Sequence, residues 1–521
     1  MMNIFEGLML GLQSALSPAI LMYTFIGVFL GTLVGALPGV GALTTISLLL
    51  PITYHLPATA AIVMLAGIYY GAQYGGSTAS ILLNLPGTPT SAVTCLDGYP
   101  MARQGRAGAA LFTVAIASLV GAIFGILMLI LFAPGIAELG SKFGPAEYFA
   151  VMLLGLVAAS TVSAGSAVKG LAMVVLGLIL GTVGMDINSG VNRFDFDIAE
   201  LWDGVSLVAL AMGVFGVAEV IASVNRKQDE LGTRKISLRD MMPACEEVRR
   251  SIAPILRGTG IGCFFGALPG TGGAIASFMS YAVEKRVAKD GSRFGKGAIE
   301  GVAAPEAANN AAAQTAFIPT LSFGIPGDVV MTLMLGALVL HGIQPGPRLV
   351  HEQPELFWGL VMSFATGNLM LVILNLPLIG IWVSMLRIPY RALYPAVLIF
   401  VCLGVYSVNN NAFDIYMVAF FGVVGYLMII LEFNPAPMLL GFVMGPMMEK
   451  NLRRALLLSR GDLAVFIERP ISAAILLACA VLLVWALWGS IRTCLHQARR
   501  YDDKKKKHHV MAGRNLDFQG K

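Results

Sequence analysis

GALPGVGALTTISLLLP, residues 35–51, places prolines and glycines inside strongly apolar sequence. Lipid cannot hydrogen-bond the backbone, so a continuous helix is the usual way for a chain to cross a membrane. Pro38 and Pro51 interrupt that pattern, and the segment between them covers less than about 20 Å at 1.5 Å per residue, against a hydrocarbon core of about 30 Å. It predicts a hairpin that enters the membrane halfway and turns back, held where protein or a water-filled cavity satisfies its backbone.

The composition around this segment is that of an all-α, polytopic membrane protein. The 521 residues are 57% hydrophobic and 12% charged, about half the charged fraction of a soluble domain. The long apolar runs leave room for about ten to thirteen membrane crossings. These runs are 109–133, 148–161, 171–184, 205–224, 357–386, 392–408, 415–431 and 471–488.

The hairpin motif occurs twice. GALPGVG at 35–41 returns 231 residues later as GALPGTG at 266–272, and the Pro-Gly pair at 86–87 returns 240 residues later at 326–327. We therefore predict two homologous membrane repeats, each with broken or re-entrant helical hairpins. The expected organisation is repeat one at 1–225, a connector at 226–251, repeat two at 252–470, a helix at 471–491 and a basic tail at 492–521.

Loop charges indicate that the two repeats are inverted. The loop after the first motif is uncharged in repeat one, whereas EKRVAKDGSRFGKGAIE in repeat two has five basic residues. After the second motif the bias reverses, because repeat one has Arg103 and Arg106 and repeat two has one Arg against two Glu. By the positive-inside rule, matching loops lie on opposite sides of the membrane. The same rule places the connector, with its seven Lys or Arg, and the basic tail in the cytoplasm.

Each Pro-Gly pair is expected to begin a short helix, whose free N–H groups carry a partial charge of about +0.5 and bind anions. Nearby hydroxyl and amide side chains would add donors. The alternative for any single residue is a packing role, in which glycines permit close contact and polar side chains bridge helices. Recurrence at matched positions favours a binding site near the membrane midplane. The candidates are Pro38, Gly39, Gly41, Thr44, Ser77, Thr78, Pro86, Gly87, Thr88, Pro269, Gly270, Thr271, Gly272, Asn309, Asn310, Pro326 and Gly327.

An acid bound at these tips requires further positive charge. Two helix ends at about +0.5 each balance roughly one carboxylate, so a di- or tricarboxylate would be carried with Na⁺ or H⁺. Asn84, Asn310 and Asp328 are the candidate cation ligands. The alternative for Asp328 is a tip residue that reaches the aqueous interface, and Glu306 is expected at an entrance, because ionised carboxylates are costly in lipid.

Several other functions find no support in the sequence. The six cysteines and six histidines have no metal-ligand spacing, so the cysteines are interpreted as packing thiols, and neither a metal site nor a cofactor is expected. No Walker A sequence is present, and the basic tail is typical of a topology anchor and not of a nucleic-acid site. The N-terminus lacks the features of a removed signal peptide. The closing NLDFQGK resembles the remnant of a protease site.

Four sequence blocks occur in order over about residues 22–448. They are GALPGVGALTTISLLLP, YGGSTASILLNLPGTPTSAV with DGYPMARQGRAGAAL, GALPGTGGAIASFMSYAVEK, and EGVAAPEAANNAAAQTAFIPTLSFGIPGD. Together they resemble the large membrane subunit of the tripartite tricarboxylate transporter family. The resemblance implies a bacterial inner-membrane secondary transporter with two partners, a small four-helix membrane subunit and a periplasmic solute-binding protein. The expected substrates are di- or tricarboxylates such as citrate, imported by cation symport and alternating access.

Two other classes of function stay open at this point, an intramembrane enzyme and an anion channel. An enzyme would need a catalytic set such as a Ser/His dyad or an HExxH helix. A channel would normally build its filter from identical segments around one pore, whereas inverted repeats favour alternating access. The sequence names neither the carboxylate nor the cation. A homo-oligomer of the membrane complex is a further partner arrangement that it allows.

Overall fold

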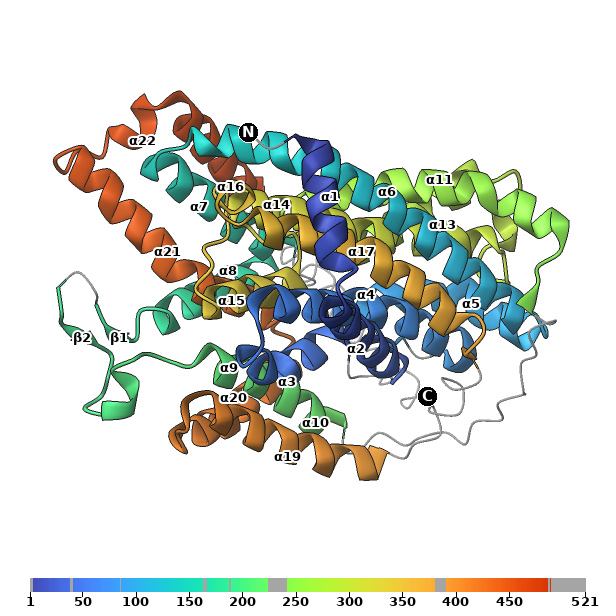
Figure 1. Cartoon of the computed structure of the whole chain (residues 1–521), viewed down its shortest axis with the longest axis horizontal. Helices are drawn as coiled ribbons and strands as arrows, with labels where there is room; N and C mark the ends of the chain where they lie inside the picture. Colours follow the sequence, from blue (N-terminus) through green and yellow to red (C-terminus); the bar gives the residue numbers. More distant parts are fainter. Residues whose placement is uncertain are drawn as a thin grey trace, which may run out of the picture.

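The structure is a computed structural model that describes residues 3–37, 41–84, 86–162, 166–186, 189–223, 241–379, 390–485 and 488. It is built almost entirely of helices, as the sequence predicts (Figure 1). One departure is a short antiparallel hairpin of β1 (Gly184–Met185) and β2 (Asn192–Arg193), which projects from one end of the molecule. Two of the predicted site residues, Pro38 and Gly39, lie outside the described residues. So do most of the connector and the basic tail.

The first part of the chain contains the two predicted breaks. Helices α2 and α3 flank the first tip, and α4 ends just before the second Pro-Gly pair. The elements are α1 (Ile4–Ala15), α2 (Pro18–Ala36), α3 (Ala42–Tyr54), α4 (Ala58–Leu83), η1 (Pro89–Ala92), α5 (Thr94–Arg103), α6 (Ala107–Ser141), α7 (Pro145–Val162), α8 (Ala167–Leu180), η2 (Ala199–Leu201), α9 (Leu207–Ala211), η3 (Met212–Val217) and α10 (Ala218–Ser223).

The second part repeats this order of breaks. Helix α11 begins at Cys245, so residues 245–251 of the expected connector are helical. The elements are α11 (Cys245–Ala267), α12 (Gly272–Val287), η5 (Gly291–Arg293), α13 (Glu300–Thr315), α14 (Phe317–Phe323), α15 (Val329–Leu340), α16 (Leu349–Glu352), α17 (Pro354–Asn375), α19 (Tyr390–Asn409), α20 (Phe413–Ile430), α21 (Ala436–Leu458) and α22 (Val465–Glu468).

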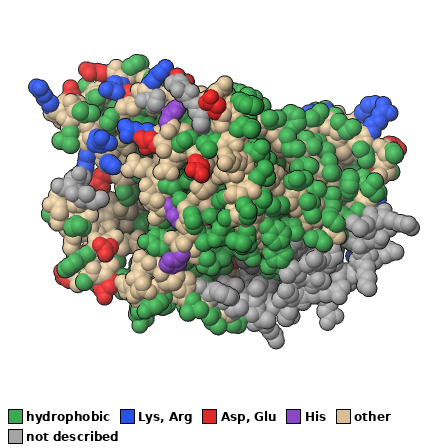
Figure 2. All heavy atoms as spheres, viewed as in Figure 1, with side chains coloured by type: hydrophobic (Ala, Val, Ile, Leu, Met, Phe, Trp, Pro, Cys, Tyr) green, Lys and Arg blue, Asp and Glu red, His purple; other side chains and the backbone are tan. Residues whose placement is uncertain are grey.

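The surface is that of a multi-pass membrane protein. Within the described ranges, four helices are long and apolar enough to cross a membrane: Pro18–Ala36, Ala107–Gly140, Pro354–Asn375 and Phe413–Ile430. Shorter apolar helices accompany them, so the number of crossings stays a prediction. Figure 2 shows a broad hydrophobic area across the middle and right of one face, with charged side chains toward the left and the far right edge.

One detail of the expected helix ends is wrong. Pro51 does not end the first hairpin, because α3 continues through it to Tyr54. Helix α12, which follows the Pro269-Gly270 pair, runs to Val287 and includes Glu284. Glu284 is tolerated there because its carboxylate pairs with Arg257 of α11, at 2.7 Å between Oε1 and a guanidinium nitrogen.

A stripe of glycines brings the helices of each part into close contact. A Cβ atom placed on Gly31 of α2 would lie 2.4 Å from the carbonyl oxygen of Ile68 on α4, and one on Gly262 of α11 would lie 2.2 Å from that of Ala308 on α13. Gly121, Gly125, Gly177 and Gly181 also pack closely, because a Cβ atom on each would lie 1.9–2.8 Å from the nearest neighbouring atom. In the stripe, Gly27, Gly31 and Gly35 face Met64, Ile68 and Ala72, while Gly258, Gly262 and Gly266 face Ala304, Ala308 and Ala312.

The two stripes correspond position by position. Each glycine on α11 follows its counterpart on α2 by 231 residues, and each residue contacted on α13 follows its counterpart on α4 by 240 residues. These are the same two offsets that separate the Pro-Gly motifs. The repetition therefore extends from the motifs to the packing of the helix pairs.

A methyl group on this stripe should destabilise the protein. We expect Gly262→Ala to lower the free energy of unfolding by about 1–3 kcal/mol, because the backbone of α13 would have to move. The matched control is Gly260→Ala on the same helix, where nothing lies within 4 Å of the added atom. There alanine should be neutral or stabilising, since glycine is the poorer helix former. Thermal unfolding of the purified variants in detergent measures both, and equal stability would contradict the packing argument.

Candidate functional site

The Pro-Gly segments are helix starts, as expected. Gly41 is the N-cap of α3, Gly272 is the first residue of α12, and Asp328 is the N-cap of α15. The segment after Pro86 first forms the short helix η1, with Thr88 at its N-cap. Gly270 and Gly272 have φ angles of +79° and +64°, which glycine adopts without the steric penalty of other residues.

The tips contact one another within each part of the chain. The Gly270 N–H donates to the Gly327 carbonyl at 3.0 Å, which joins the two motifs of the second part. In the first part, a Cβ atom on Gly87 would lie 2.0 Å from the Gly35 carbonyl oxygen. The glycines of the second Pro-Gly pairs, Gly87 and Gly327, also pack closely on the preceding backbone. A Cβ atom on Gly87 would lie 2.6 Å from the Cα atom of Gly76, and one on Gly327 would lie 2.7 Å from the Cα atom of Ala316. Glycine is therefore required at both places.

A buried cluster of hydroxyl and amide groups lies at the second tip of the first part. Thr88 Oγ1 is 2.8 Å from Thr90 Oγ1, and both hydroxyls donate to the side-chain oxygen of Gln73 on α4. Ser91 Oγ accepts from the Thr88 N–H at 3.2 Å. Gln73 was not among the predicted residues, although it is the only amide side chain in α4.

The two parts of the chain meet at these tips. A Cβ atom on Gly273, beside the first tip of the second part, would lie 3.1 Å from the Thr90 methyl group. The Tyr69 hydroxyl of α4 also donates to Asp328 Oδ2, and Asp328 Oδ1 accepts from the Met331 N–H at 2.9 Å. The Asp328 carboxylate is thus engaged as a helix cap and by a tyrosine of the other part.

Helix α13 carries the predicted amides Asn309 and Asn310, together with Glu306. All three are buried, with exposed fractions of 0–1%. The expectation that Glu306 lies at an entrance is wrong, because its side chain is fully buried. Hydroxyl groups from α4 and α5 make a polar environment for it there. The Asn310 amide donates to Ser118 Oγ at 2.8 Å. The side-chain oxygens of Asn309 and Asn310 are buried without a hydrogen-bond partner, so they are free to accept from a bound ligand or water.

Other candidates are used by the backbone or lie apart. The hydroxyls of Thr44 and Thr271 donate to the carbonyls of Phe215 and Phe265, and Thr78 Oγ1 donates to Tyr74 O at 3.3 Å. Ser77, by contrast, reaches Glu306. Asn84 is an exposed C-cap in the left-handed conformation, with no hydrogen bond to Asn310 or Asp328 in the described structure. The site-residue assignments as a whole stay predictions.

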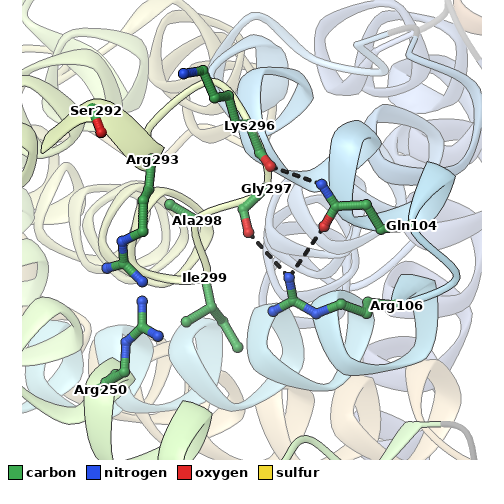
Figure 3. Close-up of a pocket in the computed structure, with 9 residues that line it drawn as sticks. All are labelled: Gln104, Arg106, Arg250, Ser292, Arg293, Lys296, Gly297, Ala298 and Ile299. Carbon is green, nitrogen blue, oxygen red and sulfur yellow. Dashed lines mark hydrogen bonds between the residues drawn. The ribbon is translucent and has the colours of Figure 1, made fainter. Parts of the chain in front are cut away.

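Away from the tips, a cavity of about 320 Å³ lies between the loops that the charge pattern marked as basic (Figure 3). Gln104 and Arg106 line one side, and Arg250 and Arg293, whose guanidinium groups face one another, line the other. Most of this charge is neutralised nearby. Arg106 pairs with Glu247, and Arg250 and Arg293 both pair with Glu300 at 2.8 and 2.9 Å. We therefore interpret this region as a polar seam between the two parts.

Asp97 is the centre of that seam. Its Oδ1 atom accepts three backbone N–H groups, from Gly295, Gly297 and Ala298, at 2.8–2.9 Å. Its Oδ2 atom accepts the Tyr281 hydroxyl at 2.9 Å. A carboxylate of the first part thus holds the loop between α12 and α13.

Asp290 of the same loop is held more locally. The Ser292 hydroxyl and backbone N–H donate to its carboxylate and keep the pKa of Asp290 below its usual value. This side chain is half exposed, with 54% of its surface accessible. It therefore serves as a reference for a carboxylate that does not join the two parts.

The comparison with known protein families covers most of the chain. Residues 21–440 match the model of the tripartite tricarboxylate transporter TctA family. The chain belongs to this family. No solved structure matches it. TctA-family proteins belong to tripartite tricarboxylate transporters.

Two relatives of this TctA-family chain come from Agrobacterium vitis. One is described as an uncharacterized 52.8 kDa protein in the TAR-I ttuC' 3' region. It is 51% identical over 497 residues, which cover 95% of this chain and 98% of the relative. The second is described as an uncharacterized protein in the TAR-II ttuC' 3' region and is 54% identical over 242 residues, 46% of this chain and all of the relative.

Removing the Asp97 carboxylate should loosen the seam. We expect Asp97→Ala to cost on the order of 3 kcal/mol of unfolding free energy, because it leaves several backbone N–H groups without an acceptor. Limited proteolysis of the 288–299 loop and thermal unfolding measure the effect. Asp290→Ala in the same loop is the control and should change stability little, since exposed carboxylates contribute little. Equal effects of the two variants would contradict the role of Asp97.

Proposed function

We propose that this chain is the large membrane subunit of a secondary transporter that imports di- or tricarboxylates, such as citrate, by cation symport. Family membership gives the general kind of protein and its two kinds of partner. The observation that carries the finer proposal is the meeting of matched broken helices, two from each part of the chain. The first-turn N–H groups of the helices that begin at these tips would hold the acid near the membrane midplane.

Contacts between loops support an inverted arrangement of the repeats. The loop after the second motif of repeat one meets the loop after the first motif of repeat two, where Gln104 Nε2 donates to Lys296 O at 2.8 Å. The loop after the first motif of repeat one likewise meets the loop after the second motif of repeat two, because His341 lies beside the backbone of Thr53. Non-equivalent loops share a face in each case, as an inverted repeat requires and a parallel repeat does not.

The proposal also includes a localisation and partners. The first pair of loops is rich in Lys and Arg, so we assign it to the cytoplasmic side of a bacterial inner membrane, with the connector and the basic tail. A periplasmic solute-binding protein would deliver the carboxylate to the opposite face. The small four-helix subunit would complete the membrane pair, and Na⁺ or H⁺ would balance the remaining negative charge of the substrate.

The direct test is carboxylate uptake into proteoliposomes that contain the membrane pair, with and without the binding protein. Uptake should saturate and follow an imposed sodium or pH gradient. An enzyme would instead change its substrate chemically, and a channel would pass current without saturation at modest concentration. Either of those results would overturn the proposal.

A bulky residue at a tip should abolish this uptake. Gly270→Leu places a side chain where the backbone contacts Gly327 and where we propose the substrate binds, so uptake should fall to background while the protein still inserts. Gly342→Leu is the matched control. Gly342 has a φ of +71°, close to the +79° of Gly270, but nothing lies within 4 Å of an added Cβ atom. Normal transport by Gly270→Leu would refute the placement of this tip at the site.

A further inference from the structure

Glu306 of α13 is a buried acid in the middle of the protein. It is fully buried, and no Lys or Arg of the described chain forms an ion pair with it. An ionisable group at membrane depth is costly, so such residues usually mark an ion or proton path. Substrate binding at the tips does not by itself require this carboxylate.

The hydrogen-bond partners of Glu306 come from both repeats. Glu306 Oε1 lies 2.7 Å from Ser77 Oγ of α4 and accepts the Thr94 hydroxyl of α5. Glu306 Oε2 lies 3.3 Å from Asn309 Nδ2, one turn along α13. The carboxyl group therefore bridges repeat one and repeat two.

The geometry satisfies this group both with and without a proton. When Glu306 is ionised, the hydroxyls of Ser77 and Thr94 donate to it. When it is protonated, its O–H can donate to Ser77 Oγ, because the Ser77 hydroxyl can turn to donate to the Gln73 carbonyl at 3.0 Å. Hydroxyl groups act as donors or acceptors in this way, whereas an ammonium or guanidinium partner would fix the charged form.

The same geometry suits a proton. An O···O separation of 2.7 Å, as between Glu306 and Ser77, is that of a hydrogen bond with a proton between the atoms. The hydroxyls of Ser77 and Thr94 both stand at hydrogen-bonding positions on Glu306 Oε1.

Glu306 is the only carboxyl group in this cluster of described side chains, and the other ionisable groups around it are as follows. Tyr74 of α4 and Cys95 of α5 lie close enough to interact with it electrostatically. Ser118 of α6 faces it without a titratable proton of its own near neutral pH. Charged groups on the other elements packed against α13 are engaged elsewhere: Asp97 of α5 with Tyr281, Arg257 of α11 with Glu284 of α12, and Arg250 of α11 with Glu300.

The position of Glu306 connects it to the proposed substrate site. Asn309, its neighbour on α13, lies beside the first tip of repeat two, since a Cβ atom on Gly273 would be 3.5 Å from the Asn309 carbonyl oxygen. Protonation of Glu306 reverses the donor direction at Ser77 and removes a negative charge near the bound acid. Both effects favour loading of an anion when the proton is present.

We propose that Glu306 is the proton-binding group that couples carboxylate import to the proton gradient. This rests on the proposed transport function and selects H⁺ over Na⁺ for it. One proton binds the ionised carboxylate from the periplasmic side and leaves it, as a proton, to the cytoplasm in each cycle. Ser77 and Thr94 are positioning residues that accommodate both states.

The test uses proteoliposomes of the membrane pair with its binding protein, free of sodium, with the membrane potential clamped by potassium and valinomycin. An inward proton gradient of about one pH unit should drive about tenfold carboxylate accumulation per coupled proton in the wild type. Glu306→Gln should lose this accumulation yet still exchange labelled for unlabelled carboxylate, because exchange requires no net proton movement. Glu352→Gln, at an exposed carboxylate with 66% of its side-chain surface accessible, is the control and should behave as the wild type.

Infrared titration of the purified pair provides a second readout that needs only folded protein. The wild type should show a protonated-carboxyl band that titrates with pH and is missing in Glu306→Gln. The proposal is overturned if Glu306→Gln still accumulates carboxylate under the pH gradient, if that band persists in the variant, or if only a sodium gradient drives the wild type. The last result would leave the proposed function intact. A wild type that neither accumulates nor exchanges carboxylate under any gradient would overturn both.

Discussion

The structure depends on the requirement that every backbone polar group at membrane depth find a partner within the protein. A break in a helix exposes N–H and C=O groups that lipid cannot satisfy. At the second-part tips these groups find one another, since Gly270 donates to the Gly327 carbonyl and the Gly327 N–H donates to Thr320 Oγ1 at 3.2 Å. Broken helices therefore require other backbone or side-chain groups within hydrogen-bonding distance. The glycine stripes allow the helices to pack that closely.

Much of this arrangement could be predicted from the sequence. Proline and glycine in apolar surroundings, recurring at matched positions, were sufficient to locate the helix starts at Gly41, Gly272 and Asp328. The membrane class and the helical architecture followed from composition alone. The sequence also contains glycines spaced four residues apart at Gly27, Gly31 and Gly35, and the same spacing begins again at Gly258. Their packing role becomes clear only when the helix that contacts them is known.

The remaining features depend on contacts between distant parts of the chain. Glu306 was expected at an entrance because an isolated carboxylate is unfavourable in lipid, and the hydroxyls that stabilise it are more than 200 residues away at Ser77 and Thr94. Asp97 belongs to a loop-like polar segment in the sequence, yet it holds a loop of the other repeat. The Pro51 expectation failed for a local reason, since a proline that loses one hydrogen bond can stay within a helix that its neighbours support.

The seam around Asp97 bears on how the molecule can move. The Asp97 carboxylate accepts four hydrogen bonds from the other repeat, and Gln104 and Arg106 add two more. These bonds join the segment around α5 to the loop between α12 and α13. Any rearrangement that exposes the tips alternately to the two aqueous phases either ruptures these bonds or leaves both loops travelling as one body. If these bonds persist, the two loops would move as one unit, and the larger displacements would fall on segments outside the seam.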